Sequence, residues 1–195
     1  MGAMSAAATP VPTGITWEEF LELPDDDVYR HAELIDGEVV LNPPVPLHQQ
    51  VIMRLLGAID AWTQAGEGRG EVTFDPAVQI TANRGYLPDA AWYPPERCAP
   101  PGQPPAWSGP PALAVEVLSP TTRTLDLFRK QTDYARVGVT EFWLIDPREP
   151  AAMIHRKPAD GSTTFAPPVD VGPGGVLSSP LLPGLEVALE RLVHR

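Results

Sequence analysis

Cysteine is almost absent from this sequence, which holds one, Cys98, among 195 residues. No intramolecular disulfide framework is therefore possible, and no CxxC pair can serve a zinc knuckle or a redox motif. Long apolar runs are also missing, because no stretch reaches the length that a bilayer span requires. Residues 1–13 lack the charged start and apolar centre of a signal peptide. We expect a cytoplasmic protein without membrane association, in which residues 1–13 form a mobile tail.

Positive charge is scarce as well. The chain has 14 Lys and Arg residues against 25 Asp and Glu residues, which gives a formal net charge of -11 and a pI near 4.7. Nonspecific binding to nucleic acid depends mainly on Lys and Arg meeting phosphates, so this balance works against loose adhesion to a polyanion. Any positive field must be local, and Arg123, Arg129, Lys130 and Arg136 fall in one short segment.

Hydrophobic residues make up 43% of the chain. At this length, that content is enough to bury a core without disulfides or structural metal. The sequence shows no internal repeats. We therefore predict a single domain over residues 14–195.

The first half of the chain has clear signals for helices and a hairpin. Thr16 is expected to begin a short helix, with Glu18 and Glu19 in its first turn. The Asp36-Gly37 pair predicts a two-residue turn within a hairpin over residues 33–41. Apolar residues at helical spacing over 47–62 predict the first long helix.

The second half alternates strands with a helix. Strands are expected at 71–81, 86–93 and 112–118, and the last run is apolar enough for a central strand covered on both faces. A proline-rich loop, 94–111, separates the last two. A second helix over 123–137 and a strand over 141–146 follow, and 150–195 indicates a weak hairpin with a short terminal segment. These elements predict an α/β domain around a mixed sheet.

Glu116 is the only charged residue in the apolar run 112–118. An ionised carboxylate in such a strand costs several kcal/mol unless it is paired or bound to metal. Strand alternation places Ala112, Ala114 and Leu118 on the same face as Glu116, and the small alanines leave space beside the carboxylate. An acid beside a gap is typical of a metal site.

Lys130 interrupts the apolar face of the second helix, because it shares that face with Tyr134 and Val137 at spacings of four and three residues. The helix follows the Glu116 strand after a short turn. Its inner face is therefore expected to pack over that strand and to bring the ammonium towards the carboxylate.

Asp89 follows Pro88 near the start of the neighbouring strand and is expected to present a second carboxylate to the same place. Mg²⁺ and Mn²⁺ take oxygen ligands, usually one or two carboxylates together with water and substrate phosphate. Such a metal acidifies water and screens charge on a phosphate, while a nearby ammonium orients the water or stabilises the transition state. Phosphodiester hydrolysis uses all of these groups.

Five segments of the chain carry a resemblance together: 32–38 (AELIDGE), 87–89 (LPD), 115–120 (VEVLSP), 126–130 with Tyr134, and 138–147 (GVTEFWLIDP). In this order, over roughly residues 16–147, the chain resembles the Uma-two family of restriction-endonuclease-like proteins in the PD-(D/E)xK superfamily. The resemblance implies a restriction-endonuclease-like core of order α-β-β-β-α-β, with an N-terminal helix and hairpin.

The same resemblance implies roles for individual residues. Asp89 and Glu116 would bind the metal, and a lysine would assist. The superfamily places that lysine two residues after the glutamate, where this chain has Leu118, so Lys130 would supply it from the helix. Glu33 matches the early glutamate of the family and is expected as a third, outer metal ligand.

Structural interpretations stay open for each of these residues. Glu116 and Lys130 could form a buried ion pair without chemistry, and Asp89 could be a turn residue at a strand edge. Glu33 could simply be solvated. Asp126 could pair with Lys130 along the helix surface and turn the lysine away from the site.

Two further residues are accessory candidates. His48 lies at the start of the first long helix, and Tyr134 is interpreted as core, with an accessory role at the site as the alternative. The other histidines show no metal-ligand spacing; they are His31, His155 and His194.

The function that this sequence supports is Mg²⁺- or Mn²⁺-dependent endonucleolytic hydrolysis of DNA by Asp89, Glu116 and Lys130. The alternatives are a non-catalytic binding or assembly module that keeps the fold, and a nuclease acting on RNA. The family resemblance also implies a homodimer, in which two sites address two strands.

Overall fold

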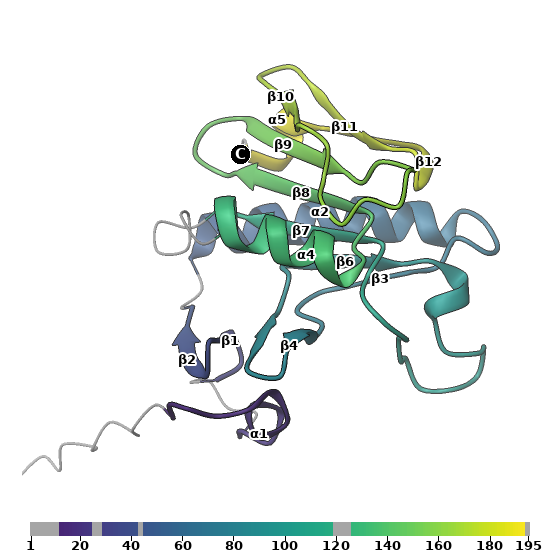
Figure 1. Cartoon of the computed structure of the whole chain (residues 1–195). Helices are drawn as coiled ribbons and strands as arrows, with labels where there is room; N and C mark the ends of the chain where they lie inside the picture. Colours follow the sequence, from purple (N-terminus) through teal and green to yellow (C-terminus); the bar gives the residue numbers. More distant parts are fainter. Residues whose placement is uncertain (1–11, 25–28, 43–44, 119–125, 194–195) are drawn as a thin grey trace, which may run out of the picture.

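The structure of the chain is a computed structural model, and it describes residues 12–24, 29–42, 45–118 and 126–193. Within these ranges the strands form a six-stranded sheet, a four-stranded sheet and a two-stranded hairpin (Figure 1). Residues 1–11 of the predicted tail and residues 123–125 of the predicted second helix lie outside the described part. Thr13 forms an isolated bridge with Glu38.

The six-stranded sheet has the order β10-β9-β8-β7-β6-β3. Its central strand β7 (Leu113–Val117) pairs in parallel with β8 (Glu141–Asp146) and antiparallel with β6 (Ala90–Tyr93). The outer strands are β3 (Glu71–Thr73), β9 (Ala151–Arg156) and β10 (Val169–Val171). Every residue of β7 is buried, which confirms the predicted central strand.

Helices cover both faces of this sheet (Figure 1). On one face, Leu55 of α2 (Pro46–Gln64) packs in one core with Val115. On the other, Tyr134 of α4 (Gln131–Val137) packs in a second core with Ala114. The π-helix η2 (Asp126–Lys130) leads directly into α4. Because neighbouring residues of a strand point to opposite faces, β7 contributes to both cores, and the predicted α/β class is confirmed.

The four-stranded sheet has the order β2-β1-β5-β4 and lies beside the large sheet, together with α1 (Trp17–Leu21) (Figure 1). Its strands are β1 (Ala32–Ile35), β2 (Glu38–Leu41), β4 (Val78–Thr81) and β5 (Arg84–Tyr86). Asp36 and Gly37 have φ values of 54° and 83°, as a tight hairpin turn requires. The predicted hairpin is confirmed.

The predicted strands 71–81 and 86–93 are wrong in extent. In each case the chain passes from one sheet to the other, so that two shorter strands replace one long strand. Residues 71–81 form β3 in the large sheet and β4 in the small one, and residues 84–93 form β5 and β6 in the same way. Pro76 and Pro88 lie at the two crossings. A proline has no N–H to donate to a strand ladder, so it ends pairing at that position.

The C-terminal part is more extensive than the predicted weak hairpin. It supplies β9 and β10 to the large sheet, the hairpin β11 (Val176–Ser179) with β12 (Leu182–Ala188), and the helix α5 (Leu189–Val193). The proline-rich loop contains a short 3₁₀ helix, η1 (Pro95–Arg97), and a bridge between Cys98 and Trp107. No helix in the described ranges combines the length and apolar character needed to cross a bilayer.

Candidate active site

Three carboxylates lie in a row across neighbouring strands of the large sheet. The β6–β7 register pairs Ala90 with Val115, so one residue further along Asp89 lies opposite Glu116. Beyond β3, whose Thr73 pairs with Ala91, the chain brings Asp75 close enough to Asp89 for the charge of Asp89 to raise the pKa of Asp75. A backbone bond from Asp75 N to Pro88 O, 3.1 Å long, holds this approach.

A cavity of about 430 Å³ opens beside the row. Among the described residues that line it, four carboxylates face one ammonium group; these are Glu33, Asp75, Asp89, Glu116 and Lys130. Negative charge therefore exceeds positive charge in the cavity, and a bound cation would offset the difference.

Lys130 lies between two buried glutamates. Its Nζ is 2.8 Å from Glu33 Oε1 and 2.9 Å from Glu116 Oε2, and the residue is 2% exposed. Tyr134, one helical turn further along, donates its hydroxyl to Glu116 Oε1 at 2.7 Å. The predicted approach of the Lys130 ammonium to Glu116 is confirmed. Tyr134 lies in the core, as expected, and in addition contacts Glu116; its accessory role stays a prediction.

Asp89 is held from two sides. Its Oδ2 accepts a 2.7 Å hydrogen bond from the backbone N–H of Val117 on β7. The same oxygen lies 3.1 Å from Nε2 of His48, in the first turn of α2. His48 is therefore beside a candidate metal ligand, which the spacing of histidines in the sequence could not show.

Glu33 is engaged through both carboxylate oxygens. Oε1 accepts from Lys130 and, at 3.3 Å, from the backbone N–H of Leu87, while Oε2 accepts from Asn42 Nδ2 at 3.2 Å. These contacts make Glu33 a support for Lys130, and its role as an outer metal ligand stays a prediction.

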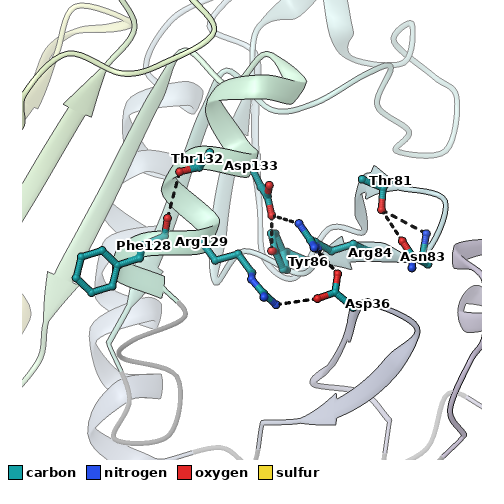
Figure 2. Close-up of polar contacts among 9 residues, drawn as sticks. All are labelled: Asp36, Thr81, Asn83, Arg84, Tyr86, Phe128, Arg129, Thr132 and Asp133. Atoms are coloured by element: carbon teal, nitrogen blue, oxygen red, sulfur yellow. Dashed lines mark hydrogen bonds and ion pairs between the residues drawn. The ribbon is translucent and has the colours of Figure 1, made fainter.

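The lysine is also supported by a polar network that joins the small sheet to its helix (Figure 2). Asp133 accepts from the Tyr86 hydroxyl at 2.7 Å and from Arg84 at 3.0 Å. Arg84 also pairs with Asp36. The Nη1 atom of Arg129 lies 3.3 Å from Oδ2 of Asp36. The hydrogen bond from Arg84 holds the pKa of Asp36 below its usual value. The network fixes η2 and α4 over β5, where Lys130 Nζ lies 5.3 Å from the Tyr86 ring centre.

The donor set fits a hard divalent cation that keeps much of its hydration. Among the residues that the structure describes, no three His, Cys, Asp or Glu side chains are arranged to hold a metal ion by themselves. Mg²⁺ is commonly bound by one or two carboxylates, with water and substrate phosphate in the remaining positions. Asp89 and Glu116, adjacent across β6 and β7, supply that number.

Asp75 is a cavity residue that the sequence patterns did not predict. Its Oδ2 lies 3.2 Å from Nδ1 of His31. Burial, and next the charge of Asp89, raise the pKa of Asp75 to about 6. The φ of Asp75 is 48°, in the left-handed region that occurs at turns. An Asp-Pro pair favours such a turn, so the Asp75-Pro76 pair is the sequence signal that could have shown a break in the predicted strand. The side chains of Arg123 and Asp126 lie outside the described residues.

The raised pKa of Asp75 predicts a pH-dependent gain of stability in Asp75→Asn. Without divalent metal, the charged form is disfavoured in the folded state, so the native carboxyl costs stability once the pH exceeds 3.8, and the cost is complete above about pH 6. The variant should therefore gain about 3 kcal/mol of stability relative to wild type between acidic and neutral pH. Urea unfolding of both proteins across this pH range measures the difference. A difference that is constant with pH would contradict the assignment.

The family of the chain follows from comparison with known proteins. A model of the Uma2 family, described as "Putative restriction endonuclease", matches residues 17–190. The fold is similar to the crystal structure of "a putative nuclease belonging to DUF820" from Anabaena variabilis ATCC 29413. The TM-score is 0.76 at 19% identity, over 92% of this chain and 97% of that one.

Comparison with curated proteins gives no match. The family model nevertheless spans most of the chain and includes Glu33, Asp89, Glu116 and Lys130. The chain therefore belongs to the Uma2 family, whose description as restriction endonucleases supports a nuclease function.

Proposed function

We propose that this protein is a Mg²⁺- or Mn²⁺-dependent endonuclease that hydrolyses phosphodiester bonds of DNA. One observation carries the proposal: Asp89 and Glu116 lie opposite each other at the cavity, and Lys130 reaches Glu116 at 2.9 Å. A metal ion, the scissile phosphate and a positive charge for the transition state would thus meet in one place.

Asp89 and Glu116 would hold the metal ion, with water and the scissile phosphate completing its coordination. When bound, Mg²⁺ acidifies water and neutralises charge on the phosphate. The chain positions its own groups for this task, because Val117 N–H and His48 orient Asp89. Tyr134 in turn orients Glu116.

Lys130 supplies the remaining positive charge. Its ammonium is almost fully buried, where electrostatic interactions are stronger than in water. Glu33 and Glu116 both hold it, at 2.8 and 2.9 Å from the nitrogen. In this position it stabilises the negative charge that develops on the phosphate during attack.

Replacement of one metal ligand provides the test of this function. Asp89→Asn is expected to lower nicking of supercoiled plasmid in Mg²⁺ or Mn²⁺ by about 10²-fold or more, because the side chain keeps its size but loses its charge. Asp60→Asn, at an exposed site on α2, is the matched control and should nick like wild type. Equal activity of the two variants would contradict the proposal.

The rival function is a non-catalytic module, which the strong acidity of the chain favours. Calorimetric titration of the same two variants with Mn²⁺ separates the two functions. Binding that is present in wild type and Asp60→Asn but lost in Asp89→Asn supports the nuclease. Absence of binding in wild type supports the module.

The homodimer and the choice of DNA over RNA rest on the family resemblance. Two copies would allow both strands of a duplex to be cut. Light scattering should give a mass near twice that of the chain, and a monomeric mass would contradict the dimer.

Parallel cleavage assays on DNA and RNA of the same sequence decide the substrate.

A further inference from the structure

The cavity that holds the carboxylates is also lined by large apolar side chains, two of which are well exposed. Phe74, in the β3–β4 connection, is 65% exposed, and Met53 of α2 is 68% exposed. Ile52, Leu56 and Leu87 continue the same lining. We call this set of five residues the apolar wall. Large apolar side chains left open to water beside a polar site are typical of a ligand-binding surface.

Phe74 is held at a fixed place relative to the candidate metal ligands. The residue before it, Thr73, pairs with Ala91 of β6, and the residue after it, Asp75, donates its backbone N–H to Pro88. Asp89 is the next residue of that strand. Phe74 is thus the sequence neighbour of Asp75, and it lines the same cavity as Asp89 and Glu116.

The charges of the cavity oppose recognition through the phosphate backbone. Lys130 is the one Lys or Arg among the described lining residues, and it is already engaged by two carboxylates. The chain as a whole carries a net charge of -11. Duplex binding without base contacts depends on many Lys and Arg contacts to phosphates, and the lining residues that the structure describes do not offer them.

Aromatic stacking is the other common source of affinity for nucleic acid, and it requires bases whose faces are open. From these observations we infer that the cavity takes an unpaired nucleotide of DNA, in a single strand or extruded from a duplex, with its base stacked on Phe74 and against the apolar wall. The inference rests on the proposed function, because it places the phosphate of that nucleotide at Asp89, Glu116 and Lys130.

The polar groups at the cavity suit this occupant. The amide of Gln49, on the exposed side of the first turns of α2, and that of Asn42 both line the cavity. Amides can donate to and accept from the hydrogen-bonding edge of a base. The cavity therefore combines a stacking surface, edge contacts and a phosphate site.

Binding of fluorescent oligodeoxynucleotides in Ca²⁺, which supplies a divalent charge at the carboxylates in place of Mg²⁺, tests the inference through a readout other than cleavage. Wild type should bind a single strand, and a duplex with one bulged nucleotide, more tightly than the fully paired duplex. Phe74→Ala should weaken single-strand binding by roughly 5- to 100-fold, the loss of one base stack. Phe74→Tyr should restore it. Phe128→Ala removes an aromatic ring that is 72% exposed and outside the cavity lining, and this control should bind like wild type.

Two results would overturn the inference: equal binding of single strand and duplex by wild type, or unchanged binding by Phe74→Ala. Tighter binding of the matching RNA would overturn the assignment of the nucleotide as DNA.

Cleavage in Mg²⁺ separates this inference from the proposed function. If Phe74→Ala cuts a paired duplex at the wild-type rate, the stacking role fails while the nuclease stands. If binding depends on Phe74 but no substrate is cut, the nuclease fails while the nucleotide site stands.

Discussion

Lys130→Met is expected to abolish DNA cleavage and to lower the free energy of unfolding by about 3 to 5 kcal/mol, the cost of leaving a buried charge without its partner. The ammonium separates Glu33 from Glu116 at 2.8 and 2.9 Å. Its removal leaves two buried carboxylates facing each other. Methionine keeps most of the volume, so the effect reports on charge and not on a cavity.

Arg136→Met is the matched control for Lys130→Met, since it removes one positive charge from an exposed position of α4, the helix that directly follows Lys130. Urea unfolding and plasmid nicking are measured on all three proteins, and cleavage is normalised to the folded fraction. A Lys130→Met protein that is less stable but cuts normally when folded would make the lysine a structural ion-pair partner. That result would contradict its catalytic role.

Glu116→Gln is expected to reduce cleavage by about 10²- to 10³-fold, as the loss of one group that stabilises the transition state commonly does. The amide keeps the size of the side chain, and its oxygen can still accept from Lys130, while its amino group takes the position that now accepts from Tyr134. Cleavage is therefore compared per folded molecule. The charge that attracts the metal is lost. Calorimetry should show weaker Mn²⁺ binding in parallel with the loss of cleavage.

A buried glutamate elsewhere in the sheet provides the control for Glu116→Gln. Glu141 of β8 is 1% exposed and accepts from Trp143 at 2.6 Å and from Ser179 at 2.8 Å. Glu141→Gln should destabilise the fold but leave cleavage per folded molecule unchanged. If both variants lose cleavage equally, Glu116 acts through stability alone, and its role as a metal ligand is contradicted.

The parts of the site that could be predicted from sequence are those set by local periodicity. The single charge in an apolar strand identified Glu116, and helical spacing placed Lys130 and Tyr134 on one face. Both patterns act over a few residues, so neighbouring residues determine them. The hairpin turn at Asp36-Gly37 was predictable for the same reason, because the turn depends on two residues that tolerate positive φ.

The rest of the site depends on contacts between distant parts of the chain. Asp75 approaches Asp89 only because residues 71–81 divide between two sheets, and a strand interpreted as continuous hides that division. His48 meets Asp89 through the packing of α2 against the sheet. The pairing of Arg84 with Asp133 likewise joins residues 49 positions apart. Side-chain patterns within one element carry no information on such distances.

The central claim is that Asp89 and Glu116 together hold a divalent metal ion. A crystal structure of the protein soaked with Mn²⁺, with anomalous diffraction recorded at a wavelength where Mn²⁺ scatters, tests it most directly. We predict an anomalous peak within bonding distance of both carboxylates, close to Lys130 and open to the cavity. A soaked crystal with no peak there, or with Mn²⁺ bound only at other sites, would contradict the claim.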